Sequence, residues 1–171
     1  MDNNQRNLLV GAGVGALLAY AIAPRRKTFD FEGKAVLIAG GSRGLGLALA
    51  GELLEQGARV AICARDENTL AEARRQLGRP NVMTIACDIV DPNAVASMIG
   101  EVSRRFGRID VLINSAGTID VGPMENLSLA DYHKAMDINF WGPLHTMLAV
   151  FPMMQRNGGG RIVNIASIGG L

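Results

Sequence analysis

Short apolar runs alternate with longer amphipathic stretches along most of the chain. The apolar runs have the length and β-branched content of buried strands, and they cover Ala35 to Ala39, Arg59 to Ala64, Val82 to Ala86, Val111 to Asn114 and Arg161 to Ile165. The stretches between them repeat apolar residues at helical spacing. Because strands alternate with helices through short loops, the pattern predicts an α/β fold with one parallel, doubly wound sheet.

Cap and turn residues set the bounds of the predicted helices. These helices cover Leu45 to Gln56, Asp66 to Leu77, Asp91 to Phe106 and a long stretch from Leu129 to about Asn157. Gly57 follows the first helix at the usual C-terminal position, and Ser128 with Asp131 forms a capping box before the last. Since proline removes a backbone donor, we expect Pro143 and Pro152 to kink or interrupt the long stretch.

The segment from Leu8 to Ala23 is apolar and uncharged, and Arg25 to Lys27 follow it closely. At roughly 16 residues it is slightly shorter than the ~20 that span a bilayer as a helix. A cleaved signal peptide is disfavoured because the basic cluster lies on the far side of the run. We expect residues 1–27 to form a membrane anchor that leaves a domain of residues 28–171 in the cytoplasm, with a free hydrophobic helix on a cytoplasmic protein as the alternative.

Composition narrows the class of protein. The chain of 171 residues is 49% hydrophobic and has a net charge of +1, so it can bury the core of one domain and has no electrostatic reason to bind nucleic acid. Cys63 and Cys87 lack metal-ligand spacing and are typical of buried thiols in a reducing compartment. His133 and His145 also lack partners at such spacing, so we predict no metal site.

A glycine-rich turn joins the first predicted strand to the first helix. It consists of Gly40, Gly41, Ser42, Arg43, Gly44, Leu45 and Gly46. Glycine permits a positive φ and removes the Cβ that would keep the backbone away from a phosphate. The N–H groups of the next helical turn add donors and a partial positive charge. The order of strand, glycine turn and helix therefore predicts a site for the diphosphate of a dinucleotide.

The spacing of Gly40, Gly44 and Gly46 resembles the glycine motif of the classical branch of the short-chain dehydrogenase/reductase family, although Ala39 stands where members usually have Thr. The segment NSAG at residues 114–117 is similar to the family's NNAG, which implies that it stabilises the central sheet and borders the cofactor. The resemblance covers about residues 29–171 and implies a Rossmann-type domain that binds NAD(P). The cofactor-binding residues that it implies are Gly40, Ser42, Arg43, Gly44, Leu45, Gly46, Arg65, Asp88, Ile89, Asn114, Ala116 and Gly117.

The end of the second strand bears on the choice between NAD and NADP. A carboxylate there would bind the 2′-hydroxyl of NAD and repel a 2′-phosphate, but Ala64 occupies the place. Arg65 follows it, and Arg43 lies in the glycine turn, so two guanidinium groups can approach a phosphate. We predict NADP in preference to NAD.

Two further residues resemble members of the family's catalytic set. Asn139 matches the Asn whose backbone carbonyl holds a water in the proton relay, and Ser167 matches the Ser that binds the substrate oxygen. The implied reaction is hydride transfer between nicotinamide and a carbonyl or secondary alcohol. The family's acid/base Tyr and its Lys, in a YxxxK motif, have no match, because Tyr20 lies in the apolar run and Tyr132 precedes Asn139.

We therefore expect the cofactor-binding part of a membrane-tethered, NADP-dependent oxidoreductase that acts on a small carbonyl or alcohol. The domain would lack the C-terminal strands and helices of the fold, so that the chain alone would be poorly stable and inactive. Its fifth strand would expose apolar surface at the edge of the sheet. A noncatalytic nucleotide-binding module is the alternative, and the family's use of the long helix in dimers makes a homo-oligomer an expectation by analogy.

Overall fold

The computed structural model describes residues 29–119 and 122–166 of the chain. Two compact units are present, Met1–Asp30 and Phe31–Leu171. The predicted apolar run from Leu8 to Ala23 lies outside the described residues. Within the ranges that are described, no helix is both long and apolar enough to cross a membrane.

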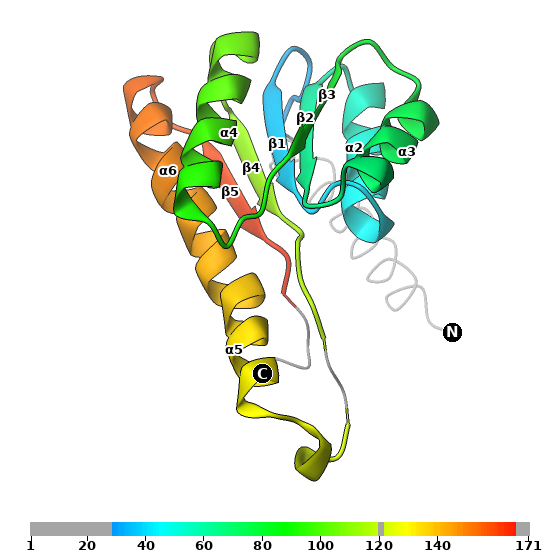
Figure 1. The fold of residues 1–171 in the computed structure, drawn as a ribbon. Coiled ribbons are helices and arrows are strands. Elements are labelled where there is room, and N and C mark those ends of the chain that lie inside the picture. The colour runs from blue at the N-terminus through cyan, green and yellow to red at the C-terminus, as the bar shows by residue number, and fades with distance from the viewer. Residues whose placement is uncertain (1–28, 120–121, 167–171) are drawn as a thin grey trace, which may run out of the picture. The chain divides into compact units, whose positions relative to one another are not determined.

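Five parallel strands form one sheet in the order β3-β2-β1-β4-β5 (Figure 1). They are β1 (Ala35–Ala39), β2 (Arg59–Ala64), β3 (Val82–Ala86), β4 (Val111–Asn114) and β5 (Arg161–Asn164). The order reverses between β1 and β4, where the chain crosses back over β1 and β2. This topology is that of a doubly wound, Rossmann-type sheet, so the predicted fold class is confirmed.

Helices cover both faces of the sheet. They are α2 (Gly44–Glu55), α3 (Glu67–Leu77), α4 (Pro92–Phe106), α5 (Leu129–Met136) and α6 (Gly142–Arg156), with a short 3-10 turn, η1 (Met124–Asn126), before α5. Figure 1 shows α2 and α3 on one face, and α4 and α6 on the other. Side chains from β1, β2 and β4 meet those of α4 and α6 in the core, where Leu37, Met98 and Val150 are fully buried or nearly so.

The predicted long helix is interrupted directly before Pro143 and continues through Pro152. A π-helical segment, η2 (Asp137–Trp141), separates α5 from α6. Pro143 lies in the first turn of α6, directly after this segment, and α6 continues through Pro152 to Arg156. The expected kink or interruption is therefore confirmed at Pro143, whereas Pro152 does not interrupt the helix. The capping box of Ser128 and Asp131 at the start of α5 is confirmed.

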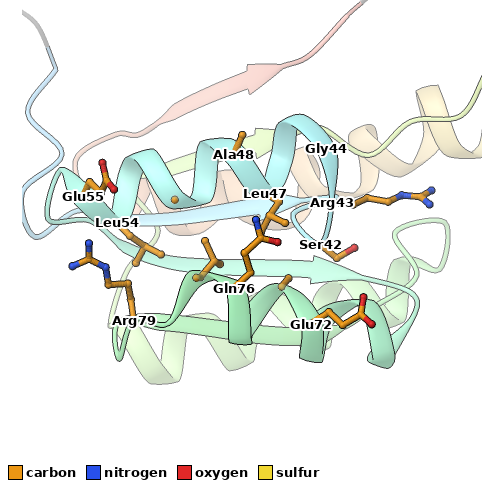
Figure 2. A pocket seen from close by; sticks show the side chains of 13 residues that line it. Ser42, Arg43, Gly44, Leu47, Ala48, Leu54, Glu55, Glu72, Gln76 and Arg79 are labelled. Atoms are coloured by element: carbon orange, nitrogen blue, oxygen red, sulfur yellow. The ribbon is translucent and has the colours of Figure 1, made fainter.

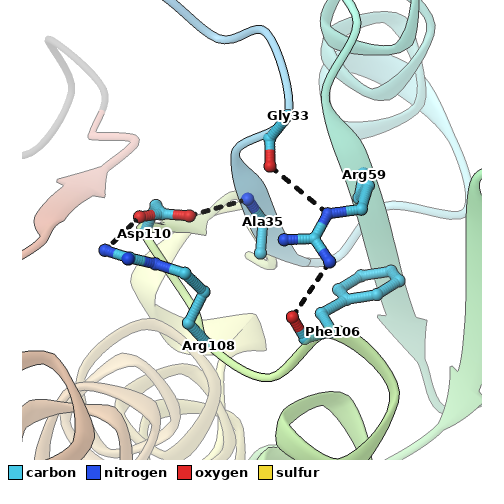
Figure 3. Close-up of polar contacts among 6 residues, drawn as sticks. All are labelled: Gly33, Ala35, Arg59, Phe106, Arg108 and Asp110. Atoms are coloured by element: carbon cyan, nitrogen blue, oxygen red, sulfur yellow. Dashed lines mark hydrogen bonds and ion pairs between the residues drawn. The ribbon is translucent and has the colours of Figure 1, made fainter. Parts of the chain in front are cut away.

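Asp110 joins the amino ends of β1 and β4 (Figure 3). One carboxylate oxygen of its buried side chain accepts a hydrogen bond from the Ala35 backbone N–H at 2.9 Å, and the other pairs with Arg108 at 2.7 Å. The Asp110 carboxylate thus satisfies a backbone donor that is buried at the start of the central strand.

We expect Asp110→Ala to lower the free energy of unfolding by about 1–3 kcal/mol, because it leaves the buried Ala35 N–H without an acceptor. Arg108→Ala removes only the partner whose side chain is 44% exposed, so its cost should stay below about 1 kcal/mol. Urea unfolding of the two variants beside the unaltered chain measures both effects. Equal losses in the two variants would contradict this account of Asp110.

Arg59 holds the amino end of β2 in a similar way. Its guanidinium donates to the carbonyl oxygens of Gly33 at 3.3 Å and Phe106 at 2.9 Å, and it lies 5.3 Å from the centre of the Phe106 ring. Figure 3 shows this group beside the Asp110 contacts. The amino edge of the sheet is therefore held by polar contacts, and its opposite edge is available for a site.

β5 lies at one edge of the sheet and is exposed along its whole length. It pairs with β4, and Ile162 and Val163 are 37% and 42% exposed. The prediction that the fifth strand presents apolar side chains is confirmed for the described residues.

Candidate functional site

A hollow of about 600 Å³ lies at the carboxyl ends of the strands, where the strand order reverses. Residues that follow each of the five strands line it. Doubly wound sheets bind their ligands at such a reversal, and ligand sites measure about 300–1,000 Å³. All predicted cofactor-binding residues line this hollow except Gly46 and Asn114. We therefore take this hollow as the candidate site.

The glycine turn folds back against the end of β2. The backbone N–H groups of Gly40 and Gly41 both donate to the Cys63 carbonyl, at 2.9 and 3.2 Å. Gly40 has a φ of +83°, and a Cβ at this position would lie 2.5 Å from the Ala116 backbone nitrogen. A Cβ on Gly41 would lie 2.6 Å from the Ile62 Cβ. The close approach of three strand ends thus requires glycine at both positions.

The amino end of α2 opens on the hollow without a cap. Arg43 is its N-cap residue and makes no side-chain capping bond, whereas Asp66 and Asp91 cap α3 and α4 with their carboxylates. Among the described residues, no acceptor is present for the N–H groups of residues 44–46. These donors, together with the positive end of the helix dipole, form a site for an anion.

Gly46 allows the glycine turn to pack closely against the start of α2. It is buried in the first turn of α2, and a Cβ there would collide with the Gly40 carbonyl oxygen. Gly44 has a φ of +55° and no atom within 4 Å of its missing Cβ, so it leaves open space at the helix start. A phosphate can therefore approach the backbone at this point.

Two arginines lie at the rim of the hollow near the end of β2. Arg43 and Arg65 are both exposed, and both line the hollow. Asp66, the carboxylate next to them, accepts a hydrogen bond from the Thr69 N–H at 2.8 Å and so caps α3. No ion-pair partner of Arg43 or Arg65 is present in the described part of the chain. The guanidinium groups of Arg43 and Arg65 are therefore available to a ligand anion, beside the carboxylates of Asp66 and Asp88 that also line the hollow.

The loop after β3 forms another wall. Asp88 accepts a hydrogen bond from the Val90 N–H at 3.1 Å, as in a local turn, and also lines the hollow. Ile89 is buried against the start of α6: a Cβ on Gly142 would lie 2.6 Å from its Cδ1. The ring nitrogen Nδ1 of His145 lies 3.2 Å from the Ile89 carbonyl oxygen. Helix α6 thus positions this loop.

We expect Gly142→Ala to displace Ile89 and to lower stability by about 1–3 kcal/mol through overpacking. Gly100→Ala is the matched control in α4, because the nearest atom to its added Cβ lies 3.8 Å away. Since alanine favours a helix over glycine, the control should gain about 0.5–1 kcal/mol. Thermal unfolding of both variants measures the difference, and a stable Gly142→Ala chain would count against the proposed contact.

Asn114 lies beneath the hollow with its side chain in the sheet. Its Nδ2 donates to Asn164 Oδ1 at 2.8 Å, and its Oδ1 accepts from Thr146 Oγ1 at 2.8 Å. These bonds join β4 to β5 and α6. Asn114 therefore supports the strand ends that form the hollow and does not line it.

Asn139 lies in the π-helical segment and holds the loop after β4. Its Nδ2 donates to the Thr118 carbonyl, and its Oδ1 accepts from the Thr118 N–H, both at 2.9 Å. π-helical segments within helices are frequent at functional sites. Ser167 lies outside the described residues, as does Tyr20, and Tyr132 lies on α5 and does not line the hollow.

The hollow also contains residues that the sequence analysis did not assign to a site. Thr69, Thr118 and the two cysteines are among them. Cys63 and Cys87 are buried free thiols, as predicted. A hydrogen bond with Cys63 lowers the pKa of Cys87, whereas the same contact and burial raise the pKa of Cys63. In the sequence, the positions of the two cysteines near the end of β2 and directly after β3 could have indicated that they lie at the site.

A second hollow of about 760 Å³ lies between α2 and α3 (Figure 2). It is larger, but it runs along the two helices with Glu55 and Arg79 at one end. Ser42, Arg43 and Gly44 line both hollows, and Figure 2 shows Arg43 at the end opposite Glu55 and Arg79. Because the uncapped N–H groups and the strand ends meet at the smaller hollow, we take that one as the candidate cofactor site.

Comparison with known proteins identifies the family. Residues 34–171 match the family model described as short chain dehydrogenase. The chain belongs to the short-chain dehydrogenase family. It is 37% identical to 11-beta-hydroxysteroid dehydrogenase A of Sesamum indicum over 142 residues. This alignment covers 81% of this chain and 40% of that protein. The predicted family is therefore confirmed, and the chain spans less than half the length of this relative.

Solved structures agree with this assignment. NAD⁺-bound xylitol dehydrogenase superposes with a TM-score of 0.77 at 33% identity, over 83% of this chain and 56% of that one. Actinorhodin polyketide ketoreductase with NADPH superposes with a TM-score of 0.76 at 32% identity, over 80% of this short-chain dehydrogenase chain and 54% of that one. The two structures contain different dinucleotides, so the family uses NAD(P) and the preference must come from local residues.

Proposed function

We propose that this chain forms the NADP-binding part of an oxidoreductase that acts on a carbonyl or secondary alcohol. The observation that carries the proposal is the uncapped start of α2 beside the glycine turn, at the reversal of strand order. The bound nicotinamide would supply or accept the hydride. The residues of this chain would bind the dinucleotide, orient it and hold the substrate oxygen.

The N–H groups of Gly44, Leu45 and Gly46 would bind the diphosphate. They have no acceptor among the described residues, and the missing Cβ of Gly44 leaves the approach open. A negatively charged group at this end of α2 is also favoured by the helix dipole. The donor set thus fits a diphosphate.

Arg43 and Arg65 would bind the 2′-phosphate of NADP. Both line the hollow, and Ala64 leaves the end of β2 without a carboxylate. The Asp66 carboxylate, which also lines the hollow, is held in the cap of α3 by the Thr69 N–H. Guanidinium groups bind phosphate oxygens through paired, charge-assisted hydrogen bonds.

The remaining predicted residues divide between the two ends of the cofactor. Asp88 and Ile89 would contact the adenine. Ala116 and Gly117 would lie beside the cofactor toward the substrate, where Asn139 positions the loop after β4 and Ser167 would bind the substrate oxygen. Thr118 is held at this end by both polar atoms of the Asn139 side chain. The family to which the chain belongs supports a substrate with a carbonyl or secondary hydroxyl group.

Residues 1–27 would form a membrane anchor, and residues 28–171 the NAD(P)-binding domain in the cytoplasm. The apolar run from Leu8 to Ala23 and the basic residues after it support this proposal. A homo-oligomer is supported by large apolar side chains exposed on α5, η2 and α6, namely Leu129, Tyr132, Met136, Phe140, Trp141, Leu148 and Phe151.

Isothermal titration calorimetry of the full chain tests the proposed function. We expect saturable binding of NADPH at one site, with weaker binding of NADH. The heat should disappear in the presence of excess 2′,5′-ADP, which competes for the adenosine end. An absence of heat with both dinucleotides, on a sample whose circular dichroism shows the folded state, would contradict the proposal.

A further inference from the structure

Three helices end in arginines at the edge where the strands begin. Because all strands are parallel, α3, α4 and α6 each lead back to the amino end of the strand that follows them (Figure 1). We call the exposed arginines in their last turns, together with the one before β3, the basic edge: Arg74, Arg75, Arg79, Arg104, Arg105 and Arg156. Within the described part of the chain, none of these side chains forms an ion pair.

The helix dipole explains each of these charges locally, but it also adds them together. Cations are favoured in the last turn of a helix and anions in the first. α3 and α4 follow this rule at both ends, since Asp66 and Asp91 cap them at the carboxyl edge of the sheet. Because the helices run in the same direction relative to the sheet, their charges do not cancel. An excess of positive charge therefore collects at the amino edge, although the net charge of the whole chain is only +1.

The carboxylates at the amino edge lie on other elements. Glu52 and Glu55 are near the end of α2, Asp30 and Glu32 come before β1, and Asp110 is buried in its ion pair. The last turns of α3, α4 and α6 contain no acidic residue. Positive charge therefore prevails at the end of α3 on one face of the sheet and at the ends of α4 and α6 on the other.

An extended anionic surface fits this arrangement better than a compact ligand. Figure 1 shows α3 and α4 on opposite faces of the sheet, and each helix is about 10 Å across, so one small anion cannot reach both arginine pairs. A lipid leaflet with anionic headgroups can reach both. In the sequence, the apolar run from Leu8 to Ala23 and the basic residues Arg25 to Lys27 come before β1, which begins at this same edge. Basic residues beside a membrane segment bind anionic lipid.

We propose that the basic edge docks on the anionic leaflet of a membrane. This inference rests on the proposed function, because the anchor at residues 1–27 would bring the domain to the lipid. Each basic residue near an anionic surface strengthens binding by about five-fold, and the effect falls off within a Debye length of ~8–10 Å. The candidate cofactor site lies at the opposite edge of the sheet, so docking leaves it open to dinucleotide from the cytoplasm.

The test uses the full chain with two kinds of vesicle, phosphatidylcholine alone and phosphatidylcholine with phosphatidylserine. Sedimentation measures the partition coefficient, and hydrogen exchange followed by mass spectrometry locates the contact. We expect phosphatidylserine to raise the partition coefficient and to slow exchange several-fold in residues 74–79 and 104–108. Exchange in residues 43–46, at the candidate cofactor site, should not change. Both effects should fall as the salt concentration rises.

The decisive variant replaces Arg74, Arg75, Arg104 and Arg105 together by Gln. With two of the four charges in contact at about five-fold each, the gain from phosphatidylserine should fall by about 25-fold or more. None of the four lines the candidate cofactor site, so the ratio of NADPH to NADH affinity should not change. The α3 pair and the α4 pair, replaced separately, should each lose part of the gain, which keeps the test decisive if the fourfold variant does not fold.

A control variant replaces Arg25, Arg26 and Lys27 by Gln. It should lower the partition coefficient and keep the slowed exchange in residues 74–79 and 104–108. If instead this variant abolished the effect of phosphatidylserine and the arginine variants retained it, the charge before β1 alone would bind the lipid and the inference would be wrong.

The outcomes separate this inference from the proposed anchor. If the chain binds both kinds of vesicle equally and exchange at the basic edge does not slow, the anchor stands and the inference is wrong. If it binds only the vesicles with phosphatidylserine and exchange at the basic edge slows, the anchor fails and the docking surface stands. Binding to neither kind overturns both. Slowed exchange at the basic edge with a short RNA duplex, but not with the anionic vesicles, would assign the surface to nucleic acid and overturn the inference.

Discussion

Gly46→Ala is expected to weaken dinucleotide binding by about 100-fold, because loss of two charge-assisted hydrogen bonds costs ~3 kcal/mol. The added Cβ would collide with the Gly40 carbonyl oxygen, so the glycine turn has to move away from the start of α2. The N–H groups of residues 44–46 then no longer converge on one diphosphate. Calorimetric titration with NADPH measures the change in the dissociation constant.

Gly51→Ala is the matched control for this prediction. It makes the same change in the same helix, and its added Cβ meets only the Leu77 Cδ2 at 3.7 Å, an ordinary contact distance. We expect it to bind NADPH as the unaltered chain does and to be slightly more stable. If Gly46→Ala bound as tightly as Gly51→Ala, the glycine turn would not be the diphosphate site.

Arg65→Asp is expected to change the ratio of NADPH to NADH affinity by 100-fold or more, which is ~3 kcal/mol of differential binding. The substitution removes a guanidinium from the rim and adds a carboxylate that repels the 2′-phosphate. The same carboxylate can accept a hydrogen bond from the 2′-hydroxyl of NADH, so NADH binding should hold or improve. The two dissociation constants, measured side by side, give the ratio.

Arg105→Asp controls for the change in net charge. Arg105 is exposed in the last turn of α4, away from the residues that line the hollow. Its replacement should lower the affinity for both dinucleotides by the same small factor and leave their ratio unchanged. An unchanged ratio in Arg65→Asp as well would show that Arg65 does not read the 2′-phosphate.

The strands could be predicted because buried strands consist mainly of apolar residues. β1 to β4 have the predicted bounds, since parallel strands covered on both faces are runs of apolar residues that end at turn residues. The caps of α3 and α5 were predictable for a similar reason, because Asp66 and Ser128 act on neighbouring residues. Such local chemistry needs no knowledge of the tertiary structure.

The remaining features depend on contacts between distant parts of the chain. The π-helical segment around Asn139 has no local signal, and its side chain is held by Thr118 in the loop after β4. The hydrogen bond between Ser42 and Thr69 joins the glycine turn to the first turn of α3. The similarity to the family's NNAG implied that Asn114 stabilises the sheet, but its partners Thr146 and Asn164 could be identified only when β5 and α6 were in place.

The central claim is that backbone N–H groups at the start of α2 hold the diphosphate of the cofactor. Nuclear magnetic resonance of the chain labelled with ¹⁵N-glycine observes these groups directly during a titration with NADPH. We predict that the amide signals of Gly44 and Gly46 shift strongly, while those of Gly107 and Gly158, at the ends of α4 and α6, stay in place. Saturation of the chain with NADPH without movement of the Gly44 and Gly46 signals would contradict the account.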